Sequence, residues 1–115
     1  MKYKWISKIE KDGLRTIQLS FYQYNLIDKD DKFLCKENYK YISYIEEDGL
    51  RITQLSDDKE NLIDSKGNLI FKQNYNFIST ICDINYNRRI DNKKIFNYKT
   101  YLKQKMIKNL LDKNN

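Results

Sequence analysis

The side chains that could do chemistry in this chain are its carboxylates and its two cysteines, because the sequence contains no histidine. Histidine is the commonest general base and metal ligand, so its absence removes the usual centre of a catalytic or metal site. Cys35 and Cys82 lie 47 residues apart and form no CxxC or metal-ligand spacing; we expect two reduced, buried thiols. No serine or cysteine stands in a motif with a base, and the three glycines form no phosphate-binding loop. We therefore expect no catalytic residue, no cofactor and no metal.

The carboxylates cluster beside turn signals, at Glu46-Glu47-Asp48 and at Asp57-Asp58. Such a position is typical of a solvated surface, which is the interpretation we adopt for both clusters. Asp28 and Asp64 end apolar runs, where an aspartate usually accepts hydrogen bonds from nearby backbone N–H groups. A glycosidase or a metal-dependent nuclease that uses these carboxylates is an alternative hypothesis, but no spacing in the sequence is specific to it.

Residues 39–74 are a second copy of residues 3–38. A shift of 36 residues without a gap makes 19 of 36 positions identical. The clearest match sets Asp12-Gly13-Leu14-Arg15 against Asp48-Gly49-Leu50-Arg51. A third copy begins at residues 75–79 and then loses the pattern. A repeat of this length indicates stacked units, because one unit is too small to bury its apolar face alone.

Each unit reads as short strands joined by tight turns. Asp12-Gly13 and Asp48-Gly49 are strong hairpin signals, because glycine adopts the positive φ that such turns need. The segments around them alternate between apolar and polar residues, which is typical of strands with one buried face. In the first unit the expected strands cover residues 3–9, 14–19, 24–28 and 32–35, and their copies follow 36 residues later.

The C-terminal part changes character after Asp83. Residues 75–91 are interpreted as a partial repeat and a loop, and residues 92–113 as a basic helix that caps the repeats, since that stretch has no glycine or proline. Asn92 or Asp91 is the expected N-cap. An apolar stripe at helical spacing supports the helix: Ile95, Tyr98, Leu102, Met106 and Leu110.

The predicted fold is therefore α+β and mainly β. Residues 1–115 form a single domain of tandem antiparallel β-meander repeats, with a 36-residue unit in two copies plus a partial third. A C-terminal helix closes the array.

Several motifs of the unit resemble the WG-repeat (KWG-repeat) family. The matching residues are Trp5-Ile6 and Tyr41-Ile42, the two Asp-Gly-Leu-Arg turns, Leu26-Ile27-Asp28 and Leu62-Ile63-Asp64, and Lys66-Gly67. The resemblance covers about residues 3–81; Tyr24-Asn25 and Glu60-Asn61 stand where the family has its Trp-Gly pair. It implies a β-repeat scaffold that mediates binding, and it implies no catalytic residues.

The net charge of +6 resides in the C-terminal part, because residues 92–115 contain seven lysines and one aspartate. A basic, partly amphipathic helix can lie along a phosphate backbone, where each contact releases a counterion. The alternative is a solvated lysine face on a capping helix. The candidate nucleic-acid-binding residues are Arg88, Arg89, Lys93, Lys94, Lys99, Lys103, Lys105 and Lys108.

Aromatic side chains are the second feature that could bind a partner. Most of them, Trp5, Tyr41 and Tyr44 among them, fit a sheet core and cross-strand pairs; exposed ones near lysines would stack on bases. Phe21 and Tyr22 are the exception, because their copies are Asp57 and Asp58. Large aromatic residues at a loop tip are good interface anchors. The candidate partner-binding residues are Phe21, Tyr22 and Tyr24.

These observations favour a non-enzymatic binding protein whose β-repeat surface docks on a protein or a ribonucleoprotein. Size, basicity and composition alone also suggest a phage or mobile-element inhibitor of a host nucleic-acid machine. The alternative is an RNA- or DNA-binding protein that acts through the basic helix. No apolar run is long enough for a membrane span and no signal peptide is visible, so we expect a cytoplasmic protein without a membrane partner. The sequence leaves its oligomeric state open.

Overall fold

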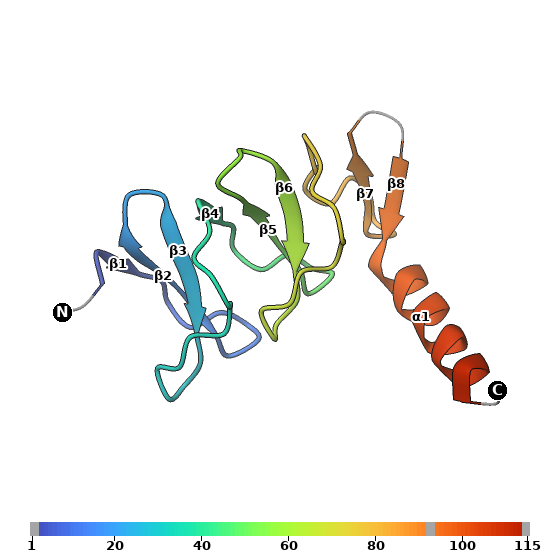
Figure 1. Ribbon diagram of the computed structural model, residues 1–115, viewed down its shortest axis with the longest axis horizontal. Helices are drawn as coiled ribbons and strands as arrows, with labels where there is room; N and C mark the ends of the chain where they lie inside the picture. The colour runs from blue at the N-terminus through green and yellow to red at the C-terminus, as the bar shows by residue number, and fades with distance from the viewer. Residues whose placement is uncertain (1–2, 92–93, 114–115) are drawn as a thin grey trace.

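The computed structural model describes residues 3–91 and 94–113. Three small antiparallel sheets follow one another along the long axis of the molecule, and a single helix leads away from the last sheet (Figure 1). The described part is therefore mainly β with one C-terminal helix, which confirms the predicted α+β class at this level. The principal extents are 49 × 34 × 27 Å.

The first two sheets have three strands each and the same strand order. The strands of the first are β1 (Trp5–Ile6), β2 (Arg15–Ser20) and β3 (Gln23–Ile27). Those of the second are β4 (Tyr41–Ile42), β5 (Arg51–Gln54) and β6 (Glu60–Ile63). Their pairing registers agree, since Trp5 pairs with Gln18 as Tyr41 pairs with Gln54, and Arg15 pairs with Ile27 as Arg51 pairs with Ile63.

The Asp-Gly turns shape the entry into β2 and β5. Gly13 and Gly49 have φ values of +85° and +86°, a region that a residue with a Cβ rarely adopts. The carboxylate of Asp12 accepts a hydrogen bond from the Leu14 N–H, and Asp48 accepts one from Leu50. Each turn is therefore specified locally by its own Asp-Gly pair.

The fourth expected strand of each unit is absent from the described sheets. Only isolated bridges remain, Ile27 with Phe33 and Ile63 with Leu69. A few backbone bonds, such as that from the Leu34 N–H to the Leu26 carbonyl, and one side chain hold this segment. Asn25 donates to the Cys35 carbonyl and accepts from the Cys35 N–H. Asn61 does the same with Phe71. The prediction of a four-stranded meander is wrong at this segment, because its backbone bonds are too few to form a ladder and a buried asparagine side chain supplies further bonds.

The apolar core lies between neighbouring sheets. One buried cluster joins Leu14, Leu26 and Cys35 to Tyr39, Ile42 and Ile63 of the following unit. The next cluster contains Leu50, Ile52, Leu62, Ile78, Ile90 and Phe96. Each sheet is too small to bury its own face, so the neighbouring unit completes the core.

The C-terminal boundaries differ from the expected ones. The third sheet consists of β7 (Asn87–Ile90) and β8 (Lys94–Asn97), so part of the expected loop and the start of the expected helix are strands. The helix α1 (Tyr98–Lys113) begins later, with Asn97 as its N-cap, because the Asn97 side chain accepts from the Thr100 N–H at 3.1 Å. Asp91 instead accepts from the Phe77 N–H, and Asn92 lies outside the described residues.

The helix covers the last sheet only at its first turn. Tyr98 and Tyr101 pack on the second cluster, next to Phe96. No residue of α1 is buried, and Figure 1 shows the rest of the helix extending beyond the sheets. Most of the expected apolar stripe is therefore exposed, and Ile95 belongs to β8 rather than to the helix.

Candidate partner-binding surface

The turn between β2 and β3 presents two large aromatic side chains to solvent. Phe21 and Tyr22 are 73% and 68% exposed, and Tyr22 has a φ of +60°. A cation lies near each ring: Lys4 Nζ is 3.3 Å from the centroid of Phe21, and Lys40 Nζ is 5.0 Å from that of Tyr22. Contact with a cation orients an exposed ring without covering it, so the pair is positioned as well as accessible.

The corresponding turn of the second unit is acidic. Asp58 has a φ of +67° and forms an ion pair with Lys40. The hydrogen bond between Lys40 and Asp58 raises the pKa of Lys40 above its ordinary value. Turns with positive φ at corresponding positions thus carry aromatic groups in one unit and carboxylates in the next.

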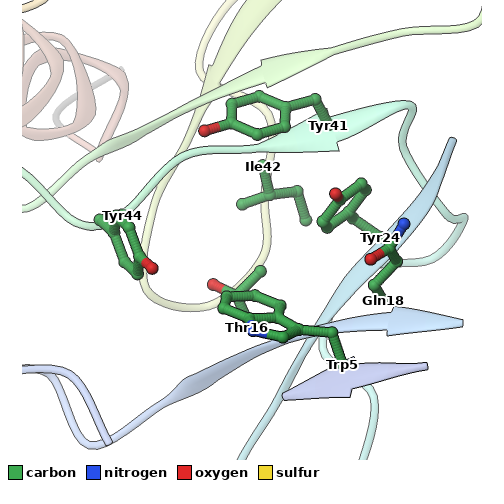
Figure 2. A pocket seen from close by; sticks show the side chains of 7 residues that line it. All are labelled: Trp5, Thr16, Gln18, Tyr24, Tyr41, Ile42 and Tyr44. Atoms are coloured by element: carbon green, nitrogen blue, oxygen red, sulfur yellow. The ribbon is translucent and has the colours of Figure 1, made fainter. Parts of the chain in front are cut away.

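Next to the aromatic turn lies a pocket of about 290 Å³ between the first two sheets. Four aromatic rings surround it, from β1, from β3, from β4 and from the loop after β4 (Figure 2). Tyr24 and Tyr41 meet edge to face with centroids 5.6 Å apart. The lining residues are Trp5, Thr16, Gln18, Tyr24, Tyr41, Ile42 and Tyr44.

Three of these rings were expected in the sheet core or in cross-strand pairs, and instead each has 40% or more of its surface exposed. Trp5, Tyr41 and Tyr44 have 40%, 45% and 63% of their surface accessible. The registers give the reason, because Trp5 lies opposite Gln18 and Tyr41 opposite Gln54, both polar. A cross-strand partner that is polar is the sequence signal that these aromatics face outward.

Tyr24 and Lys40 connect the turn to the pocket along the chain. Tyr24 follows the turn on β3 and reaches into the pocket, while Lys40, which contacts Tyr22, directly precedes Tyr41. We call these residues the aromatic surface: Trp5, Phe21, Tyr22, Tyr24, Tyr41 and Tyr44. Its chemistry suits aromatic or aliphatic side chains, with Lys4 available to an acidic neighbour, whereas Lys40 is paired with Asp58.

The candidate nucleic-acid-binding residues divide into one buried arginine and a set of exposed cations. Arg88 is fully buried and bonds the carboxylates of Glu46 and Asp48 at 2.7–2.8 Å. Burial would lower its pKa, but these hydrogen bonds raise it, so the guanidinium stays charged. A phosphate has no access to it, which corrects the expectation for Arg88. The expectation of a solvated surface is likewise wrong for Glu46 and Asp48, whereas Glu47, Asp57 and Asp58 are exposed as expected.

The remaining cations are exposed but do not share one face. Lys99 and Lys103 are four residues apart on the helix, whereas Lys105 and Lys108 are turned away from them at 3.6 residues per turn. Lys105 and Lys108 line a hollow with residues 69–72 of the second unit. Arg89 and Lys94 are exposed in the third sheet. Lys93 lies outside the described residues.

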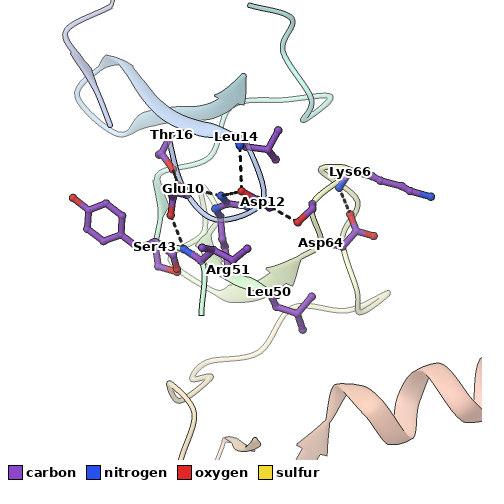
Figure 3. A network of polar contacts seen from close by, with 12 residues as sticks. Glu10, Asp12, Leu14, Thr16, Ser43, Leu50, Arg51, Asp64 and Lys66 are labelled. Atoms are coloured by element: carbon purple, nitrogen blue, oxygen red, sulfur yellow. Dashed lines mark hydrogen bonds and ion pairs between the residues drawn. The ribbon is translucent and has the colours of Figure 1, made fainter. Parts of the chain in front are cut away.

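A second buried arginine joins the first two units (Figure 3). Arg51 is fully buried and bonds Glu10 and Asp12 at 2.7–3.0 Å. Burial would lower the pKa of Arg51, and the hydrogen bonds with Asp12 and Glu10 raise it. This role of Arg51 was not predicted from the sequence, although the identical Asp-Gly-Leu-Arg segments mark both the acidic and the basic partner.

The two cysteines differ in burial, and the potential metal ligands do not cluster in the described residues. Cys35 is buried as expected, whereas Cys82 is exposed, which corrects that prediction. Over residues 3–91 and 94–113 no group of three or more potential ligands could hold a metal ion.

Comparison with known proteins yields no match to a family model, to a curated protein or to a solved structure. The WG-repeat resemblance therefore stays a prediction. Within the described part of the chain, α1 is neither long nor apolar enough to cross a membrane.

Proposed function

We propose that this chain is a non-enzymatic binding protein that docks on a protein partner through the aromatic surface. The observation that carries the proposal is the accessibility of Phe21 and Tyr22 directly beside a pocket with aromatic walls. Aromatic residues dominate binding energy at interfaces because each buries a large area at little cost in conformational entropy.

The preformed geometry supports a docking role. Lys4 and Lys40 orient the two exposed rings, and the Tyr24–Tyr41 contact fixes one wall of the pocket. A surface that is ordered before binding loses less entropy on association. The partner we expect inserts apolar or aromatic side chains into the pocket and places an acidic group near Lys4.

Site-specific crosslinking and affinity measurements test this proposal together. A photoreactive phenylalanine analogue at position 21 should capture one partner from host extract, and the same analogue at Phe33 should not. Phe33 is a suitable control because, like Phe21, it is an exposed aromatic residue. The purified partner should then bind the Phe21→Ala, Tyr22→Ala double variant at least tenfold more weakly, about 1.4 kcal/mol.

Two control variants show whether a loss of affinity is specific to the aromatic surface. Phe33→Ala and Phe77→Ala remove exposed rings elsewhere and should leave the affinity within about twofold, as for residues outside an interface hot spot. If these controls weaken binding as much as the double variant does, or if the double variant binds like the wild type, the aromatic surface is not the docking site.

The second candidate function is nucleic-acid binding, and the exposure of Lys99, Lys103, Lys105 and Lys108 on a projecting helix favours it. Replacing these four lysines with glutamine should abolish RNA binding and flatten its salt dependence, by roughly one unit of slope for each phosphate that is no longer bound. Ending the chain at Leu102 removes three of these lysines and keeps Phe96, which is part of the core. RNA binding that survives both changes would contradict this candidate.

A further inference from the structure

The two junctions between units are held by the same set of polar contacts. At the first, Arg51 bonds Glu10 and Asp12, and the Ile45 N–H donates to Glu10 at 2.7 Å. At the second, Arg88 bonds Glu46 and Asp48, and the Ile81 N–H donates to Glu46 at 3.2 Å. In both cases an arginine and a backbone amide of one unit bind a Glu-x-Asp-Gly turn of the preceding unit.

The same donors are present in the first unit. Arg15 precedes Arg51 by 36 residues and occupies the same register position, opposite Ile27 as Arg51 is opposite Ile63. Ile9 likewise corresponds to Ile45. Within residues 3–91 and 94–113, Arg15 forms no ion pair and the Ile9 N–H forms no hydrogen bond.

The 36-residue correspondence adds a third group, a lysine, to Arg15 and the Ile9 N–H. Ser65 of the second unit donates to Asp12 at 2.7 Å, and the residue 36 positions before it is the exposed Lys29. A lysine there replaces a neutral hydroxyl donor with a cation. We call Arg15, the Ile9 N–H and Lys29 the Arg15 site.

We propose that the Arg15 site binds a Glu-x-Asp-Gly turn of another polypeptide in the geometry that Arg51 uses for residues 10–13. Charge complementarity identifies the partner, because a planar guanidinium with an adjacent N–H matches two carboxylates two residues apart. The internal junctions show that this chain's own backbone supports that geometry twice.

A second copy of this chain does not fit the site. Its two Glu-x-Asp-Gly turns are already bound by Arg51 and Arg88. The turn of the third unit places Cys82 where the second has Glu46, since the Cys82 N–H donates to Asn87 as the Glu46 N–H donates to Leu50. The partner must therefore bring a turn of its own.

A peptide titration of the full chain tests the proposal. The probe is a cyclic hairpin peptide that carries Glu-Lys-Asp-Gly, the sequence of residues 10–13, and the readout is the ¹⁵N chemical shift of the Ile9 amide. We expect a saturable shift of Ile9 and its neighbours. Arg15→Gln should weaken the affinity at least tenfold, and a peptide with Gln-Lys-Asn-Gly should not bind.

Arg89→Gln is the matched control, because Arg89 is an exposed arginine without such an arrangement. It should leave peptide affinity within twofold. The proposal is overturned if Ile9 does not shift at millimolar peptide, or if Arg15→Gln and Arg89→Gln have equal effects. It is also overturned if the free protein self-associates through Arg15. None of these outcomes bears on the aromatic surface, which is tested with other variants.

Discussion

Arg51 donates hydrogen bonds to both carboxylate oxygens of Asp12, a residue 39 positions earlier in the chain, at 2.7 and 3.0 Å. The guanidinium is fully buried, and the carboxylate is largely buried as well. This bidentate pair fixes the second sheet to the turn that starts β2. It therefore connects the local turn chemistry of one unit to the packing of the next.

Loss of one member of this pair should destabilise the whole protein. Arg51→Ala leaves Glu10 and Asp12 partly buried without their cation, and we expect a loss of about 3–5 kcal/mol in the free energy of unfolding. Urea denaturation followed by circular dichroism measures it. Arg15→Ala, at the corresponding position, forms no ion pair in the described structure. It should cost only about 0.5 kcal/mol, and equal losses would refute the role of the junction.

Stability should fall at acidic pH because of Asp12. Burial alone would raise its pKa, but hydrogen bonds from Arg51 and Ser65 outweigh burial and hold the pKa below the ordinary value of 3.8. A group whose pKa is depressed in the folded state stabilises that state above its unfolded pKa. The contribution is lost as the pH falls through the folded value.

The unfolding free energy of the wild type should therefore decrease as the pH is lowered below about 4. In Asp12→Asn the decrease over the same interval should be smaller, and the variant should be less stable at pH 7. Denaturation curves at several pH values measure both. An unchanged pH dependence in Asp12→Asn would show that the Arg51 contact is not linked to this titration.

The two thiols should differ strongly in reactivity. Burial raises the pKa of Cys35 to about 11, so about one molecule in a thousand carries the thiolate at pH 8. The hydrogen bond with Ser79 lowers the pKa of the exposed Cys82. Labelling with an aromatic disulfide reagent should show one fast and one very slow phase. Cys82→Ser should remove the fast phase, and Cys35→Ser should leave it unchanged.

Glycine substitutions should separate backbone strain from close packing. An added Cβ at Gly49 meets nothing within 4 Å, whereas at Gly67 it would lie 2.6 Å from the Leu34 carbonyl oxygen of the preceding unit. Both residues have positive φ. Gly49→Ala should cost about 1–2 kcal/mol from the left-handed conformation alone, and Gly67→Ala roughly 1–3 kcal/mol more from overpacking.

Thermal denaturation compares the two variants directly. Asp31, which takes the place of Gly67 in the first unit, has a φ of +61°, so the backbone conformation itself is tolerated there. If Gly49→Ala and Gly67→Ala shift the melting temperature equally, contact with Leu34 does not contribute to the junction.

Local signals in the sequence were sufficient for the turns and for most strands. Asp-Gly pairs marked the turns before β2 and β5, where Gly13 and Gly49 have positive φ, whereas Tyr22 and Asp58 adopt positive φ in the following turns without a glycine. Asp28 and Asp64 accept backbone hydrogen bonds after β3 and β6, as expected for aspartates at strand ends. The fourth segment was predicted wrongly, because it forms only a single bridge to the preceding strand and is held further by the side chains of Asn25 and Asn61. Alternation of apolar residues does not reveal such side-chain bonds.

Sequence also identified Phe21 and Tyr22 as exposed, since their counterparts Asp57 and Asp58 are acidic. It did not separate Arg88 from Arg89, which are adjacent arginines in a basic region. Alternation in β7 buries Arg88 and exposes Arg89. Burial of Arg88 is favourable only because Glu46 and Asp48 lie within hydrogen-bond distance of its guanidinium.

The amino-acid sequence by itself determined properties that depend on a few neighbouring residues: the Asp-Gly turns, the main strands of the first two units and the presence of a C-terminal helix, though not the residue where that helix begins. Tertiary structure alone decided which polar groups meet, because Arg51 and Asp12, or Arg88 and Asp48, are about 40 residues apart. Whether a carboxylate or an arginine faces water or a buried partner depends on the distance and dielectric environment created when two units pack together.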